Sequence, residues 1–253
     1  MLSRFKYRLM LLCMAVLLAH CQLCHAAEAL ETNCAFVYHD KTIIVDIDGT
    51  AKFIHDGMLM EEDDEIAIGR VADSIVPLNY YGDCSELAYY SMTAKRYILI
   101  CENAYGTPFC SGYAAFVHDH SVHIMDSHGH RVKTIENCDV VEPQFANQLP
   151  FVLRKEDDEN SQYFLFDPAM NTTILLSHAI DVGAFSENLC SFKAANGLYG
   201  YINTKGEIVI PPDYVIAADF VDGNAYVQGK NMHWYIIDPN GGVVSEIESF
   251  QEP

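Results

Sequence analysis

The chain has few basic residues. Only 15 Lys and Arg stand against 35 Asp and Glu in 253 residues, which gives a formal net charge of −20. A chain of this sign repels nucleic acid phosphates and anionic lipid headgroups. The composition therefore argues against nucleic acid as a partner. The simplest role of the negative charge is to keep the protein soluble.

The short motifs of several common enzyme classes are missing as well. Gly-x-Ser-x-Gly, His-Glu-x-x-His and the phosphate-cradling Gly-Lys-Ser/Thr do not occur in the sequence. No Ser-His-Asp or Cys-His arrangement stands out either. We therefore expect a protein without enzymatic activity and without a cofactor.

Long apolar runs are absent except at the N-terminus, where Leu9–Ala19 is apolar. This run follows a basic stretch and precedes small residues, and it is too short to cross a bilayer comfortably. Residues 1–26 are thus predicted to be a signal peptide, cleaved after Ala26 or Ala29. We expect a secreted or periplasmic protein with no membrane insertion after signal removal. An uncleaved anchor is the alternative; lipid attachment at Cys21 is less favoured, because His20 precedes it where a small residue is preferred.

Removing residues 1–26 leaves 227 residues with 12 basic and 35 acidic side chains, a formal charge of −23. Six cysteines remain, and none of them forms a Cys-x-x-Cys pair: Cys34, Cys84, Cys101, Cys110, Cys138 and Cys190. An even number in an exported chain permits up to three disulfides, in about 15 possible pairings. Buried free thiols are the alternative. The absence of Cys-x-x-Cys argues against a thioredoxin-like or zinc-ribbon protein.

The sequence does contain an internal repeat. The stretch from Phe185 and the stretch from Phe220 match at a constant offset of 35 residues. The matched pairs are Phe185 with Phe220, Tyr199 with Trp234, Ile202 with Ile237, Asn203 with Asp238, and Gly206 with Gly241. Fainter copies begin at Phe145, Phe109, Cys84 and Cys34. A period of this length is typical of solenoids and propellers.

The letters "FSENL" and "NGLYGYINTKGEIVIPPDY" resemble the bacterial WG-repeat (KWG-type) family. In this family an aromatic entry precedes a Trp-Gly-Tyr-Ile-Asp strand, a Gly turn and an Ile-Pro-Pro-x-Tyr exit. Here Tyr199 replaces the usual Trp, and Tyr235 replaces the following Gly in the next copy. The resemblance covers residues 145–253 clearly and residues 27–144 as degenerate repeats. It implies a fold more firmly than an activity.

The repeat predicts an all-β fold, with about six short antiparallel β-meanders of ~35 residues in a curved solenoid-like or propeller-like array. We expect three strands in each unit, separated by Gly and Asn turns. Pro211 and Pro212 should close the third strand at a sheet edge. Only the segment Glu65–Ile75 shows a weak helical pattern.

The stretch "IIVDIDGTA", residues 43–51, resembles the first motif of haloacid-dehalogenase-like phosphatases. Asp46 would be the nucleophile there, with Asp48 beside it, and Mg²⁺ would be required. This alternative also needs a helix-bearing α/β domain, of which the sequence shows no sign. Aligned with "GYINTKGEIVI", Asp46 takes the place of Asn203 and Gly49 that of Gly206. The repeat therefore predicts a hairpin, with a strand after Thr50.

A second candidate site lies in the His-rich segment 118–130. His118 with His120, or His128 with His130, could offer two imidazoles to Zn²⁺ or Cu²⁺. The repeat places the two pairs at opposite ends of one strand, so we expect solvated turn histidines or at most a weak metal site. The acidic runs at residues 61–65 and 156–159 are predicted to be solvated loops. The function favoured is an exported binding scaffold for an unidentified protein or glycan partner.

Overall fold

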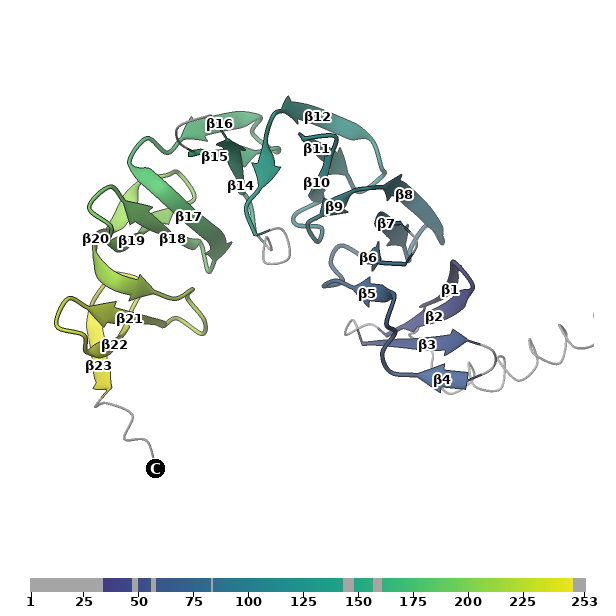
Figure 1. Cartoon of the computed structure of the whole chain (residues 1–253), viewed down its shortest axis with the longest axis horizontal. Helices are drawn as coiled ribbons and strands as arrows, with labels where there is room; N and C mark the ends of the chain where they lie inside the picture. The colour runs from purple at the N-terminus through teal and green to yellow at the C-terminus, as the bar shows by residue number, and fades with distance from the viewer. Residues whose placement is uncertain are drawn as a thin grey trace, which may run out of the picture. The chain divides into compact units, whose positions relative to one another are not determined.

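The computed structural model describes residues 34–46, 50–55, 58–82, 84–142, 148–156 and 161–247, and the predicted signal peptide lies outside these ranges. The chain divides into two compact units, Met1–Asp63 and Asp64–Pro253. Within the described residues every regular element is a β-strand, and all strand pairs are antiparallel (Figure 1). The predicted all-β array of short antiparallel repeats is therefore confirmed.

The first unit contains one four-stranded sheet, in the order β1 (Cys34–Tyr38), β2 (Lys41–Val45), β3 (Ala51–His55) and β4 (Met58–Met60). Alternate residues of β2 are buried, as expected for a strand with one face on a core. An ion pair lies in this unit: Lys41 Nζ is 2.9 Å from Asp63 Oδ1, and both side chains are less than a tenth exposed. The prediction of a solvated acidic loop at residues 61–65 is therefore wrong for Asp63.

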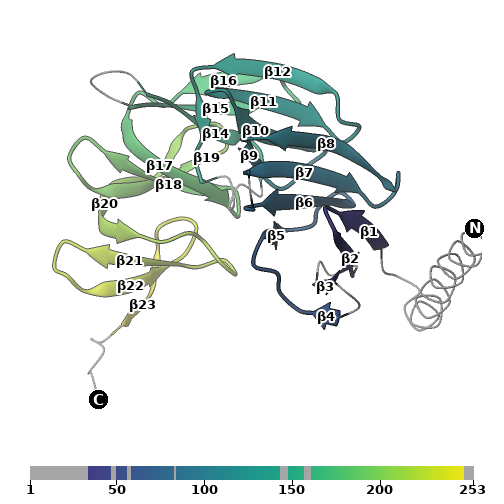
Figure 2. The ribbon, with the colours of Figure 1, turned by 45° about the vertical axis from the view of Figure 1, so that its right-hand side comes forward.

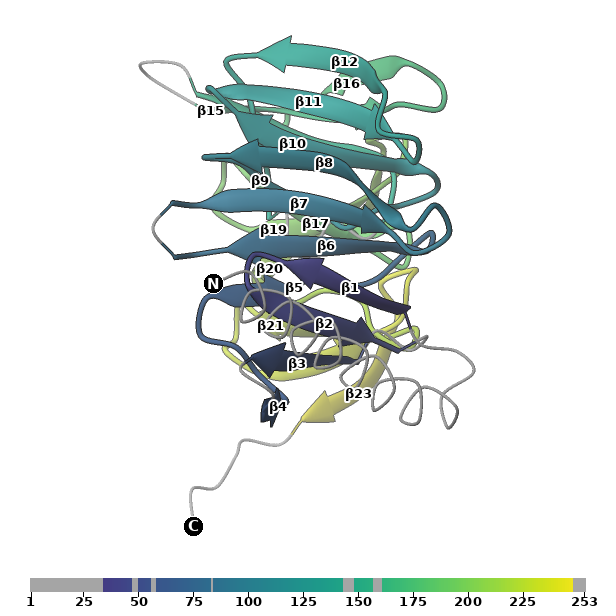
Figure 3. The same ribbon diagram turned by 90° about the vertical axis from the view of Figure 1, so that its right-hand side faces the viewer.

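The second unit begins with three four-stranded sheets. The first contains β5 (Ile66–Ile68), β6 (Ile75–Tyr80), β7 (Glu86–Ser91) and β8 (Arg96–Glu102). The second contains β9 (Tyr105–Gly106), β10 (Tyr113–His118), β11 (Ser121–Asp126) and β12 (Arg131–Glu136). The third contains β13 (Asp139–Val140), β14 (Phe151–Glu156), β15 (Ser161–Asp167) and β16 (Thr172–Leu175). Figures 2 and 3 show β6, β7 and β8 side by side, and likewise β10, β11 and β12.

The last sheet of this unit has seven strands. They are β17 (Ala179–Ser186), β18 (Leu189–Ala194), β19 (Tyr199–Asn203), β20 (Ile208–Ala217), β21 (Ala225–Gly229), β22 (Trp234–Ile237) and β23 (Val243–Ile247). The ten-residue β20 pairs with both β19 and β21, so it ends one four-stranded meander and begins the next. With the four smaller sheets this gives the six repeats that the sequence predicts.

Three details of the prediction are wrong. Each repeat has four strands and not three. The additional strand is the segment that carries the entry aromatic residue, such as β17 with Phe185. Residues 65–75 contain β5 and the start of β6 in place of a helix, since Asp73 and Ser74 have φ of 52° and 60° and turn the chain. Pro211 and Pro212 lie inside β20, at a shift in its register with β19, where the missing N–H groups break no ladder.

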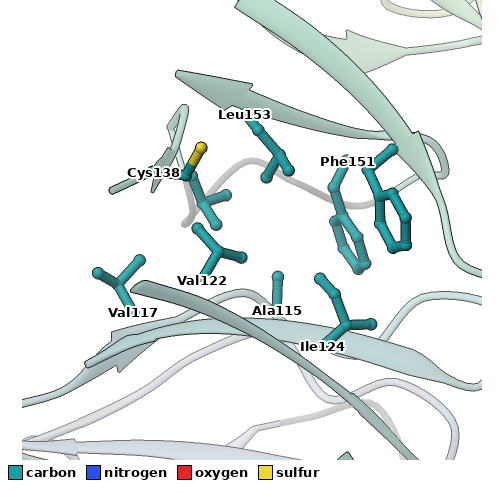
Figure 4. Packing of buried hydrophobic residues seen from close by; sticks show 9 residues of the cluster. Ala115, Val117, Val122, Ile124, Cys138, Phe151 and Leu153 are labelled. Atoms are coloured by element: carbon teal, nitrogen blue, oxygen red, sulfur yellow. The ribbon is translucent and has the colours of Figure 1, made fainter. Parts of the chain in front are cut away.

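Neighbouring sheets of the second unit pack face to face through apolar clusters. Between the β9–β12 and β13–β16 sheets, side chains of β10 and β11 meet those of β13 and β14 (Figure 4). This cluster contains Ala115, Val117, Val122, Ile124, Cys138, Val140, Phe151, Leu153 and Phe166. Similar clusters join the β5–β8 sheet to the β9–β12 sheet, and the β13–β16 sheet to β17–β19. In this part of the chain the repeats thus bury apolar faces against their neighbours.

The entry motif "FSE" connects one repeat to the next by hydrogen bonds. Ser186 Oγ donates to the carbonyl oxygen of Phe220 at 2.6 Å, and Glu187 Oε2 accepts from the backbone N–H of Gly223 at 2.9 Å. In the same manner Asp73 Oδ2 accepts from the N–H of Gly112 at 2.7 Å. The letters of the motif are therefore explained by contacts between repeats.

Candidate functional site

Asp46 ends a strand and enters a hairpin. Its N–H donates to the carbonyl oxygen of Thr50 at 2.8 Å, and β3 follows at Ala51 and pairs with β2. The same bond over four residues occurs at Asp126, Asn203 and Asp238, at 2.9 to 3.0 Å. The strand predicted after Thr50 is thus present, where the phosphatase motif would require a helix. Asp48 lies outside the described residues.

The residue type at this position follows from turn chemistry. Asn203 Oδ1 accepts the N–H groups of Lys205 and Glu207, at 2.9 and 3.0 Å. Asp238 Oδ1 accepts those of Asn240 and Gly242 at 2.8 and 2.9 Å. A short Asp or Asn side chain that binds the following N–H groups stabilises such turns. By its place in the repeat, Asp46 is therefore a turn residue.

The two histidine pairs lie at opposite ends of β11. His118 ends β10 and His120 lies in the turn before β11, whereas His128 and His130 lie in the turn after it. The rings of His128 and His130 stack at 5.9 Å, and His130 Nδ1 is 3.2 Å from Asp126 Oδ2. Among the residues that the structure describes, no three His, Cys, Asp or Glu side chains form a group suited to a metal ion.

His118 and His120 instead line a pocket of about 660 Å³, which we call the histidine-turn pocket. It lies where the β9–β12 sheet meets the β13–β16 sheet. Its other polar walls come from β9, β13, β14 and three connecting turns: Asn103, Tyr105, Asp119, Asn137, Asp139, Arg154 and Glu156. Val117 and Cys138 form its buried apolar side.

Four side chains inside this pocket form one network: Tyr105, Asp139, Arg154 and Glu156. Tyr105 Oη donates to Asp139 Oδ1 at 2.7 Å. The Nη2 atom of Arg154 lies 3.6 Å from Asp139 Oδ2 and 3.3 Å from Glu156 Oε1. Burial, and then the hydrogen bond to Asp139, raise the pKa of Tyr105 well above its usual range. The phenol therefore stays protonated and remains a donor at physiological pH.

The backbone around the pocket is held in tight turns. Asn103, Asp119, His120 and Asn137 have φ of 53°, 48°, 56° and 53°. Asn and Asp adopt this left-handed region more readily than most residues. The pocket thus presents donors and acceptors from fixed turns, an arrangement suited to binding a polar group.

The sequence indicated only two of the residues in this pocket, His118 and His120. His128 and His130 are not part of it. Tyr105, Asp139 and Arg154 carry no local motif, because the packing of two sheets brings them together. Glu156 also lines the pocket, although it begins an acidic run that the sequence predicts to be a solvated loop.

The cysteines give no disulfide in the part of the chain that the structure describes. Cys84, Cys101, Cys110, Cys138 and Cys190 are free thiols. Burial raises the pKa of Cys190, Cys138 and Cys110 above the usual value of a thiol, so these groups are poorly reactive. The described part of the structure therefore does not show the predicted disulfides, and Cys110, Cys138 and Cys190 are buried free thiols, as in the alternative.

Residues 199–231 match the family model described as WG containing repeat. The resemblance to WG repeats is thus confirmed for this segment, which runs from β19 into the turn after β21. No curated protein matches the chain. Within the described residues no helix is long and apolar enough to cross a membrane.

Among solved structures, the chain is similar to a eukaryotic initiation factor, with 11% identity and a TM-score of 0.50. The match covers 85% of this chain and 62% of that one. The β-propeller domain of the Trilobed protease from Pyrococcus furiosus also matches, with 11% identity, a TM-score of 0.48, and coverage of 87% and 80%. At these identities the similarity concerns the fold alone.

Proposed function

We propose that the chain is an exported WG-type repeat protein that binds a partner through the histidine-turn pocket and acts without catalysis. The observation that supports this most is the construction of the pocket. Donors and acceptors from two packed sheets line a recess of about 660 Å³, a volume typical of binding sites.

A fixed pocket favours binding because little conformational entropy is lost when the partner docks. The left-handed turn residues and the hydrogen bond from Tyr105 to Asp139, which links the two sheets, hold its walls in place. Arg154 supplies donors, Asp139 and Glu156 supply acceptors, and the half-exposed ring of Tyr105 offers an aromatic face. Such a set suits a polar segment of a protein or the hydroxyl groups of a glycan.

Binding is tested by probing the mature chain, residues 27–253, against a glycan array and a peptide library. Tyr105→Ala should lose the interaction, and Tyr226→Ala, which removes an exposed tyrosine of β21, should keep it. Binding to glycans alone or to peptides alone would decide the partner class. A wild-type chain that binds neither, or a Tyr105→Ala variant that binds normally, would refute the pocket as the site.

Absence of catalysis is tested separately with p-nitrophenyl phosphate, with and without Mg²⁺. We expect no turnover above background. Turnover that disappears in Asp46→Asn would overturn this part of the proposal and restore the phosphatase alternative.

Export is tested by expressing the full chain in a bacterium and determining the mass of the protein in each cell fraction. We expect a product in the periplasm or the medium that begins directly after Ala26 or Ala29. A full-length product that stays in the cytoplasm would contradict this part of the proposal.

A further inference from the structure

A second recess lies between the same two sheets, bordered by β12 on one side and by β14, β15 and β16 on the other. Its volume is about 420 Å³, within the range of small-molecule sites. We call it the lysine groove, after Lys133 of β12 and Lys155 of β14 at its rim.

The floor of the lysine groove is apolar. Ile135 and Phe164 are half-buried and pack against the core between the two sheets, and Leu153 belongs to that core (Figure 4). The groove therefore opens onto part of the intersheet core that these two sheets do not fully cover. An apolar chain lying there gains about 25 cal/mol for each Å² of apolar surface removed from water.

The rim is basic, in contrast to the rest of the chain. Lys133 and Lys155 face one acidic side chain of the lining, Glu136, whereas the whole chain has a net charge of −20. Lys133 Nζ contacts the neutral Asn171 Oδ1 at 3.4 Å and lies 5.5 Å from the centre of the Phe166 ring. Neither lysine has a carboxylate partner among the described residues.

Two ammonium groups that have no carboxylate partner among the described residues, beside an apolar floor, are complementary to a ligand with an apolar chain and one negative charge. We propose that the lysine groove binds a small amphiphilic carboxylate, with its chain on Ile135 and Phe164 and its carboxylate between Lys133 and Lys155. A cationic amphiphile is repelled by the two ammonium groups. A neutral one leaves them without a partner. This groove is distinct from the histidine-turn pocket, although Cys138 lines both.

Isothermal titration calorimetry of the mature chain tests the proposal, with decanoate as the probe, below its micelle concentration, and decan-1-ol as the uncharged analogue. We expect one decanoate per chain, bound about tenfold more tightly than decan-1-ol, because charge-assisted hydrogen bonds form only with the carboxylate.

The double variant Lys133→Gln/Lys155→Gln should lose this tenfold preference and bind decan-1-ol as the wild type does. The matched control is Lys193→Gln/Lys205→Gln, which removes the same charge from the β17–β23 sheet and should bind decanoate normally. Thr173→Trp places a large ring in the groove and should weaken binding of both probes.

Equal affinities for decanoate and decan-1-ol, or no binding of decanoate at about 1 mM, the range of weak sites, would overturn the proposal. So would an equal loss of decanoate affinity in both double variants, since this would show a general charge effect. Tighter binding of a short peptide with a free C-terminal leucine would assign the groove to peptide ends and overturn the small-molecule ligand.

Discussion

Gly200 and Ile210 approach so closely that a β-carbon on Gly200 would lie 2.4 Å from the carbonyl oxygen of Ile210. The same added atom would be 2.8 Å from the backbone of Pro211 and Pro212. The glycine of the "YGYI" strand and the two prolines of β20 are therefore structurally linked. The backbone of β20 shifts its register at the prolines and lies so close to Gly200 that no side chain fits there. In the next copy Tyr235 takes the place of Gly200, and its partner strand β23 contains no proline.

Gly200→Ala should destabilise the protein by about 3 kcal/mol, because backbone atoms that cannot rotate away would have to move. Urea unfolding followed by circular dichroism measures this loss. Gly197→Ala is the matched control: Gly197 has a φ of 81° but nothing within 4 Å of an added β-carbon. We expect it to cost about 1 kcal/mol, from backbone strain alone. Equal losses in the two variants would refute the steric argument.

Tyr201→Phe should destabilise the protein by about 1 to 2 kcal/mol, because removing the hydroxyl leaves a carbonyl without its donor. The hydroxyl donates to the carbonyl oxygen of Ala218 at 2.6 Å, and the ring lies edge-on to Phe220 of the next repeat. Tyr226→Phe, at an exposed position, should change stability by less than about 0.5 kcal/mol. Urea unfolding of both variants measures the loss of unfolding free energy in each. Similar losses in Tyr201→Phe and Tyr226→Phe would contradict the prediction.

The sequence predicts the repeats well because the residues that mark them act locally. Asn203, Asp238 and the glycines three residues later form turns within a few residues of chain, so the same letters recur every 35 positions. The prediction that Pro211 and Pro212 end a strand is wrong because their place inside β20 depends on Gly200, which lies on the neighbouring strand β19. The fourth strand is missed for a related reason: β17 is defined by pairing with β18, and its own letters are irregular.

The pocket is less predictable still. Tyr105 and Arg154 are 49 positions apart and belong to different repeats, and only the packing of their sheets brings them to one recess. A single sequence shows which residues build a turn or a core, but it does not show which polar residues of two neighbouring repeats face each other.

Asp63→Asn should destabilise the first unit by about 3 kcal/mol, since it removes a buried negative charge that lies 2.9 Å from the buried ammonium of Lys41. The double variant Lys41→Met/Asp63→Leu removes both charges and should be closer to the wild type than Asp63→Asn is. Thermal unfolding of the three proteins gives the comparison. A double variant less stable than Asp63→Asn would contradict the prediction.

Protonation of His123 should lower the stability of the folded protein below neutral pH. The side chain is buried in β11, with Nδ1 3.0 Å from Thr134 Oγ1, and its ring lies 5.0 Å from that of Phe116. Burial, and then the charge of Arg131, lower the pKa of His123 below its usual value. The unfolded chain therefore binds a proton more readily than the folded one.

The contribution of His123 to stability is full above the unfolded pKa of about 6.5 and is lost as the pH falls toward the lower folded pKa. The wild type should thus lose thermal stability between about pH 7 and pH 5. His123→Gln, which keeps a polar group near Thr134 but does not titrate, should lose less over the same range. Midpoints of unfolding at several pH values measure this difference. Parallel curves for the two proteins would show that His123 does not carry the pH dependence.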